Sequence, residues 1–158
     1  MIIIGFDPGT AITGYGVIEV LGNKIKPIDY GCIITDKKSS TAERLMIIDK
    51  EASKLIKKYK PKKIAVEDIF FFKNLKTAIK VSQARGVILA AAARLKTPFI
   101  EEYTPLQIKQ AISGYGRADK KQVQKMVKIL LNLKTIPKPD DAADGLAAAI
   151  CCAHTNHL

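Results

Sequence analysis

The stretch IIIGFDPG at residues 2–9 decides how the chain opens. A compact apolar run that ends in turn residues is typical of a buried strand followed by a reverse turn. Asp7 therefore stands at the end of a buried strand, where sheet proteins often place their chemistry. Because Asp also begins many ordinary turns, this motif taken alone favours a functional carboxylate and a simple turn equally.

Two further β-rich segments follow, at residues 15–20 and 28–35, with a reverse turn predicted at residues 21–24. Together with the first strand they predict an antiparallel three-strand meander. An amphipathic helix is predicted from Thr41 up to Pro61, and its lysine-rich end agrees with the preference of helix C-termini for cations.

Strands and helices alternate in the rest of the chain. Short strands are predicted at residues 63–67 and 97–101. Helices are predicted at residues 74–95, 105–113, 120–131 and about 140–152. The order βββαβαβ followed by helices indicates an α/β protein with one mixed sheet flanked by helices. No linker or repeat divides the 158 residues, so a single domain spanning 1–158 is expected.

The charge balance is strongly positive. Twenty-six Lys and Arg against fifteen Asp and Glu give a net charge of +11. This excess is typical of proteins that bind polyanions such as nucleic acids. Only four of these residues are arginines, which supply the bidentate fork that reads guanine, so contact with the DNA backbone is favoured over sequence readout. The alternative is that the lysine richness reflects only the coding bias of the organism.

Features of a secreted, membrane or zinc-binding protein are weak. Apolar stretches are too short to span a bilayer, and Met1 leads directly into the apolar run without a signal-peptide pattern. No membrane association is expected, and the predicted location is cytoplasmic. Cys32, Cys151 and Cys152 are expected to be reduced thiols, because the spacing of structural zinc sites is absent.

Acidic residues recur at the ends of predicted elements. Glu67 ends the strand at residues 63–67, so it reaches the same sheet edge as Asp7 if the two strands are neighbours. Asp141 and Asp144 are three residues apart and share one face of the last helix. These acids also have simpler interpretations. Glu67 could face solvent where its strand ends, and Asp141 and Asp144 could be acids that the helix dipole favours near a helix N-terminus. Asp144 fits that interpretation less well, because its surroundings are apolar.

An acidic cluster on a basic protein is the arrangement that a nuclease needs. Mg²⁺ prefers carboxylate oxygens, and two such ions can activate water and stabilise the leaving oxygen of a phosphodiester. The lysines would hold the polyanion. The sequence therefore predicts a metal site built from Asp7, Glu67, Asp141 and Asp144.

Several segments, taken in order, resemble the RuvC family of Holliday-junction resolvases. They are residues 4–10 (IGFDPGT) with 13–17 (TGYGV), 65–70 with 73–74, 82–86 (SQARG), 108–110, 120–124 and 141–147 (DAADGLA). The match covers nearly the whole chain. It implies an RNase H-like fold with three antiparallel strands and two parallel ones, and a homodimer that makes paired nicks in four-way junction DNA.

The resemblance also implies roles for individual residues. Asp7, Glu67, Asp141 and Asp144 match the family's four metal-binding catalytic acids, for two Mg²⁺ ions that Mn²⁺ can replace. Lys109 and Lys120 match catalytic basic residues near the scissile phosphate. The residues predicted to contact DNA are Phe70, Lys73, Arg85 and Lys121, with Phe70 stacking on bases. The family works with the RuvA–RuvB branch-migration complex.

Two departures leave choices open. The run Phe70-Phe71-Phe72 does not say which ring contacts DNA, and Asp140 stands beside Asp141 as a fifth acid. Three other functions compete. An actin-like kinase would need a second domain, a YqgF-like nuclease would act on RNA, and a non-catalytic junction-binding module would not need four placed carboxylates.

Overall fold

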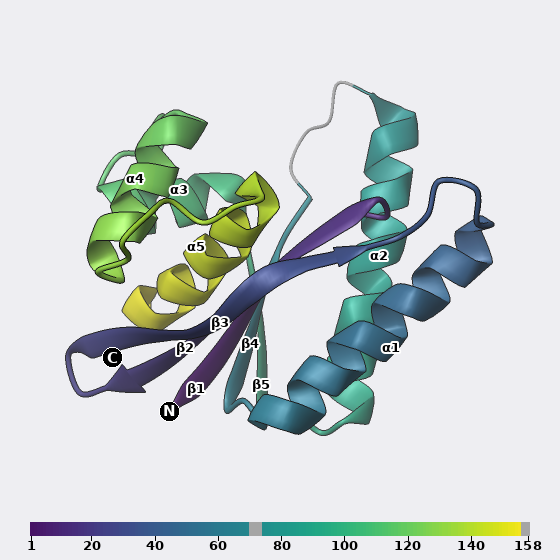
Figure 1. The fold of residues 1–158 in the computed structure, drawn as a ribbon, viewed down its shortest axis with the longest axis horizontal. Coiled ribbons are helices and arrows are strands. Elements are labelled where there is room, and N and C mark those ends of the chain that lie inside the picture. The colour runs from purple at the N-terminus through teal and green to yellow at the C-terminus, as the bar shows by residue number, and fades with distance from the viewer. Residues whose placement is uncertain (70–73, 156–158) are drawn as a thin grey trace.

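The computed structural model describes residues 1–69 and 74–155, and it contains one five-stranded sheet (Figure 1). The strands are β1 (Ile2–Asp7), β2 (Ile12–Leu21), β3 (Lys24–Ile34), β4 (Lys63–Glu67) and β5 (Phe99–Tyr103). Their order across the sheet is β3-β2-β1-β4-β5. The predicted α/β class and single mixed sheet are confirmed.

Strand pairing changes from antiparallel to parallel at β1, and β2 runs opposite to the other four strands. β1 pairs antiparallel with β2, and β2 pairs antiparallel with β3, whereas β1–β4 and β4–β5 are parallel pairs. The prediction of three antiparallel and two parallel strands is therefore confirmed. In the β1–β4 register Phe6 lies beside Val66, so the next residues, Asp7 and Glu67, emerge together at the carboxyl edge of the sheet.

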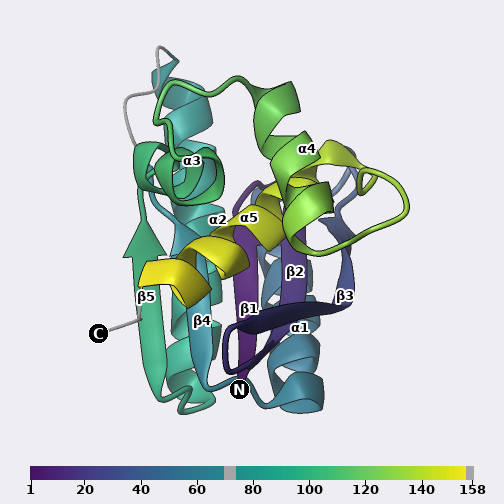
Figure 2. The ribbon, with the colours of Figure 1, turned by 90° about the vertical axis from the view of Figure 1, so that its left-hand side faces the viewer.

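Helices cover both faces of the sheet (Figures 1 and 2). On one face lie α1 (Thr41–Tyr59) and α2 (Leu75–Arg94). On the other lies α5 (Asp140–Thr155), with α3 (Pro105–Ser113) and α4 (Lys120–Leu130) packed outside it. Each face has its own apolar core, with Phe6 and Ile88 in one and Ile3 and Leu146 in the other. No described helix is long and apolar enough to cross a membrane.

Helix α5 lies unusually close to β1 and β2 because glycines face it. A Cβ at Gly14 would lie 1.8 Å from the backbone oxygen of Asp141, and one at Gly5 would lie 2.2 Å from that of Gly145. Only glycine permits so close an approach. This packing brings the acidic N-terminal turns of α5 against β1, which ends at Asp7, and against β2.

The last strand begins later than expected. The sequence predicts a strand at residues 97–101, but β5 runs from Phe99 to Tyr103. After α2 the chain turns through Lys96 in a left-handed conformation, and the Thr97 N–H donates to the Ala92 oxygen, so Thr97 still belongs to the helix end. Pro98 has no N–H for a strand ladder, which moves the start of pairing to Phe99.

Candidate active site

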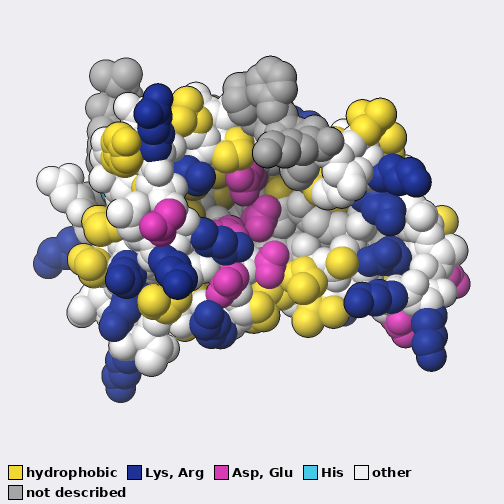
Figure 3. Space-filling model, turned by 90° about the horizontal axis from the view of Figure 1, so that it is seen from above, with side chains coloured by type: hydrophobic (Ala, Val, Ile, Leu, Met, Phe, Trp, Pro, Cys, Tyr) yellow, Lys and Arg dark blue, Asp and Glu magenta, His cyan; other side chains and the backbone are white. Residues whose placement is uncertain are grey.

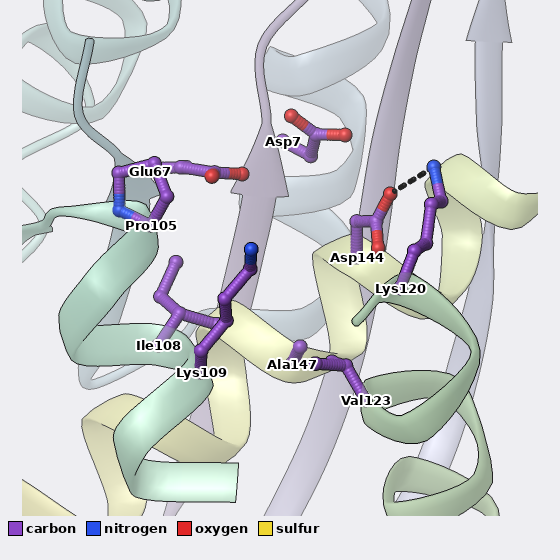
Figure 4. Close-up of a pocket in the computed structure, with 9 residues that line it drawn as sticks. All are labelled: Asp7, Glu67, Pro105, Ile108, Lys109, Lys120, Val123, Asp144 and Ala147. Atoms are coloured by element: carbon purple, nitrogen blue, oxygen red, sulfur yellow. Dashed lines mark ion pairs between the residues drawn. The ribbon is translucent and has the colours of Figure 1, made fainter. Parts of the chain in front are cut away.

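A cavity of about 330 Å³ opens at the carboxyl edge of β1 and β4 (Figure 4). Three carboxylates line it, from Asp7 at the end of β1, Glu67 at the end of β4 and Asp144 on α5. Two lysines complete the polar lining, Lys109 from α3 and Lys120 from α4. The fold therefore brings together five residues that are spread over 138 positions of the chain, from residue 7 to residue 144.

The wider surface around this cavity separates the two signs of charge. In Figure 3 acidic side chains gather in a hollow near the middle of the face, while lysine and arginine side chains lie on both sides of it. A positive rim around a carboxylate-lined hollow attracts a polyanion and holds its backbone near the acids.

The carboxylates of the cavity are poorly solvated and repel one another. Burial raises the pKa of Asp7, and the charges of Glu67, Asp144 and Asp141 add to that effect, giving a value of about 9. Burial also raises the pKa of Glu67, although a hydrogen bond with Asp7 opposes the shift. Asp7 therefore keeps its proton near neutral pH and shares it with Glu67. A bound cation would remove this repulsion.

The two lysines offset part of the negative charge. The Lys120 Nζ lies 2.9 Å from Oδ2 of Asp144. Burial raises the pKa of Asp144, and this ion pair opposes the shift. Both Lys109 and Lys120 lower the pKa of Glu67 through their charge. They therefore stand where the negative charge of a phosphate oxygen would also be stabilised.

Asp140 and Asp141 differ in where the structure places them. The Asp140 carboxylate is exposed and accepts a hydrogen bond at 2.9 Å from Lys138 Nζ, and this contact lowers its pKa. Asp141 raises the pKa of Asp7 by its charge, whereas Asp140 has no such effect among the causes that shift Asp7. Asp141 does not line the cavity itself, so its assignment as a metal ligand stays a prediction.

The donor set fits a divalent metal ion. Carboxylate oxygens are the ligands that hard cations prefer, and these three half-buried carboxylates line one cavity. Among residues 1–69 and 74–155, no three Asp, Glu, His or Cys side chains are already arranged as a complete coordination site. The raised pKa of Asp7 favours its protonated form, and Lys120 pairs with Asp144 at 2.9 Å, so an incoming cation would compete with that proton and with that lysine.

Of the four residues predicted to bind DNA, the structure describes two, Lys121 and Arg85. Phe70 and Lys73 lie outside the described residues, as do Phe71 and Phe72. Lys121 is exposed on α4 beside Lys120. The Arg85 guanidinium, on α2, pairs with Asp68 at 3.0 Å and with Glu102. Asp68 directly follows β4, and Glu102 lies on β5 beside Val66. Arg85 thus has internal partners, and its contact with DNA stays a prediction.

Sequence reasoning missed the apolar wall of the cavity and the Arg85 contacts. Ile108 and Val123 line the cavity next to the lysines. The sequence does carry a signal for this apolar wall. Ile108 directly precedes Lys109, and Val123 lies one helical turn after Lys120. No signal in the sequence indicated that Asp68 and Glu102 would meet Arg85, since their strands pair only in the folded sheet.

The model of the family described as "Crossover junction endodeoxyribonuclease RuvC" matches residues 3–152. The chain belongs to the RuvC family. The RuvC of Desulfitobacterium hafniense (strain DSM 10664 / DCB-2) is 55% identical over 158 residues, which cover 100% of this chain and 95% of that protein. The RuvC of Halothermothrix orenii is 58% identical over 160 residues, with the same coverage of both chains.

Solved structures agree with this family membership. Thermus thermophilus RuvC in complex with Holliday junction substrate has a TM-score of 0.92 and 35% identity, over 98% of this chain and 94% of that one. The yeast mitochondrial Holliday junction resolvase Ydc2 has a TM-score of 0.66 at 15% identity, so the likeness extends to the fold alone. The RNase H-like fold expected from the resemblance to RuvC is confirmed.

Proposed function

We propose that this RuvC-family protein is a divalent-metal-dependent endonuclease that resolves Holliday junctions. One observation carries the proposal, the convergence of Asp7, Glu67 and Asp144 with Lys109 and Lys120 on a single cavity. The net charge of +11 supports a polyanionic substrate, and the likeness to a RuvC solved with a Holliday junction supports four-way junction DNA.

Asp7, Glu67, Asp141 and Asp144 would hold two Mg²⁺ ions, which Mn²⁺ can replace. When bound, the metal supplies an activated water and charge stabilisation at the phosphodiester. Asp7 carries the proton that must leave before a cation enters, because it holds that proton near neutral pH. This proton loss couples metal binding to pH.

The lysines and the apolar wall prepare the cavity for a phosphate group. Lys109 and Lys120 hold ammonium groups at the rim, where they stabilise negative charge on the phosphate oxygens. Ile108 and Val123 exclude water from one side of the cavity, which strengthens these interactions. Hydrolysis leaves a 5′-phosphate and a 3′-hydroxyl.

We further infer that residues 1–158 form one nuclease domain that acts as a homodimer, because a two-fold dimer matches a junction that is itself nearly two-fold symmetric. The two sites then nick strands of like polarity. Phe70, Lys73, Arg85 and Lys121 contact the DNA arms, and the RuvA–RuvB complex is the partner that moves the branch point.

The test compares substrates and metal. The protein is incubated with a synthetic four-way junction, a linear duplex and RNA of the same sequence, each with Mg²⁺, with Mn²⁺ and with a chelator. Symmetric nicks in the junction alone, and only with a metal ion, are expected. Cleavage of RNA alone would assign the chain to an RNA-processing nuclease, and metal-independent binding without cleavage would make it a junction-binding module.

A further inference from the structure

A second concave surface lies at the opposite end of the sheet from the cleavage cavity. Its volume is about 540 Å³, and it lies between the C-terminal ends of α1 and α2, where β4 and β5 begin. Four lysines line it, Lys57, Lys60, Lys62 and Lys96. We call this surface the basal pocket. Since Lys62 precedes β4 and Glu67 ends it, the whole length of that strand separates the basal pocket from the carboxylates.

The lysines of the basal pocket differ from their neighbours in having no acidic partner. Lys58 pairs with Asp29 at 3.9 Å, and Lys63 pairs with Glu101 at 3.3 Å. Within residues 1–69 and 74–155, none of the four pocket lysines forms an ion pair. The four exposed lysine side chains therefore carry positive charge that no described carboxylate neutralises, and this charge favours an anionic ligand.

Two of these lysines occupy positions that normally favour glycine. Lys60 ends α1 with φ 46°, and Lys96 follows α2 with φ 56°, both in the left-handed region. Helix α3 ends in the same conformation with Gly114, at φ 70°. Glycine adopts this conformation without strain, whereas lysine does not. At two adjacent helix ends the sequence thus has a strained residue with a positive charge.

The helix dipole explains only three of the four lysines in the basal pocket. Cations near helix C-termini interact favourably with the helix dipole, which accounts for Lys57, Lys60 and Lys96. Lys62 belongs to no helix, since it follows Pro61 at the start of β4. Its Nζ lies 5.4 Å from the centroid of the Phe99 ring, a contact that holds the ammonium beside the pocket.

The remaining lining of the basal pocket is largely apolar. Pro61 and Leu95 are buried or half-buried, and Pro98 is exposed. Phe99, beside the pocket, is 50% exposed. A DNA backbone would neutralise the lysines but would leave this apolar lining without a partner. An acidic peptide that also carries an apolar side chain would satisfy both parts of the surface.

We propose that the basal pocket docks an acidic segment of a partner protein. An apolar side chain of that segment packs on Pro61, Leu95 and Pro98, and flanking carboxylates pair with the four lysines. The contact lies outside the cleavage cavity, so the partner and the junction can be bound at the same time. This role goes beyond the proposed nuclease function, because it assigns a protein-binding surface to the end of the sheet opposite the cleavage cavity.

The decisive variant is the double substitution Lys60→Gly/Lys96→Gly. It removes two charges while relieving the left-handed strain, so the folded protein is expected to be as stable as the wild type or more stable. The matched control, Lys24→Ala/Lys26→Ala, removes two exposed lysines from the β2–β3 hairpin. Neither pair belongs to the cleavage cavity, so junction cleavage should stay unchanged in both.

Binding is tested with a phage-displayed library of random decapeptides, selected on the wild-type protein after depletion on the double-glycine variant. The expected peptides contain Asp or Glu on either side of a Leu, Ile or Phe. A synthetic peptide of that sequence should bind about tenfold more weakly to the double-glycine variant, the loss expected for two exposed ion pairs, and equally well to the control variant. Replacing its apolar residue with Ser should weaken binding as well.

Three outcomes would overturn the proposal. One is the selection of peptides that are no more acidic than the unselected library. Another is equal loss of peptide binding in the control variant, which would mean that net charge alone attracts the peptide. The third is competition by a short DNA duplex with the same dependence on Lys60 and Lys96, because the basal pocket would then be a nucleic-acid surface.

Discussion

The two ends of strand β4 carry opposite charges in opposite environments. At one end Glu67 lies with Asp7 and Asp144 in a cavity where burial raises the pKa of all three carboxyl groups. At the other end Lys62 and the other three lysines of the basal pocket are exposed. Buried like charges destabilise a fold, whereas exposed lysines cost little. The carboxyl end of the sheet is therefore arranged to bind a cation, and this arrangement costs the metal-free protein stability.

The largest expected effect comes from Asp7→Asn, which removes the most perturbed acid. Cleavage of a four-way junction should fall by roughly a hundredfold or more, since even indirect loss of metal-site groups costs about 10–100-fold. Junction binding should be unchanged, because an amide adds no repulsion toward phosphate. Gel-shift and single-turnover cleavage assays measure the two effects, and equal losses of both would mean that Asp7 has a structural role.

The substitution Lys120→Ala should cause the next largest loss of cleavage activity. The cleavage rate at saturating junction should fall by about a hundredfold, as for removal of a group that stabilises a developing oxyanion. Lys125→Ala is the matched control, because Lys125 lies on the same helix but outside the cavity. If both variants lose affinity and rate alike, the contribution of Lys120 is only to overall charge.

The stability of the metal-free protein should depend on pH through Asp7. The folded protein keeps the Asp7 proton up to a pKa of about 9, while the unfolded chain loses it near 3.8. Stability therefore falls as pH rises between these values, by on the order of a few kcal/mol in all. Thermal unfolding in a chelator from pH 5 to 9 should show this fall, and Asp7→Asn should flatten it. An equally steep slope in the variant would assign the effect to another group.

A smaller loss of stability is expected from Arg85→Ala, which removes the ion pairs that join α2 to the ends of β4 and β5. The loss of contacts with Asp68 and Glu102 should lower the free energy of unfolding by about 1–2 kcal/mol, less than for a fully buried pair because both carboxylates are partly exposed. Urea unfolding measures this change. Unchanged stability would mean that these ion pairs do not hold α2 in place, and unchanged junction affinity would contradict the proposed contact of Arg85 with DNA.

The sequence predicted the carboxyl end of the sheet better than the opposite end. Asp7 and Glu67 each end an apolar strand, and parallel pairing then brings them together, so local patterns were sufficient. The pairing of Asp140 with Lys138, the partners of Arg85 and the left-handed Lys60 depend on tertiary contacts or backbone geometry. Hydrophobic periodicity carries no information about such contacts.

Binding of a cation by the carboxylates of the cleavage cavity should displace a proton from Asp7. Isothermal titration of Mg²⁺ into the protein at pH 7.5, repeated in buffers of different ionisation enthalpy, counts the protons released. About one proton per site is expected in the wild type, since Asp7 is protonated at that pH, and none in Asp7→Asn. Tight Mg²⁺ binding without proton release, or the same release in both proteins, would contradict the claim.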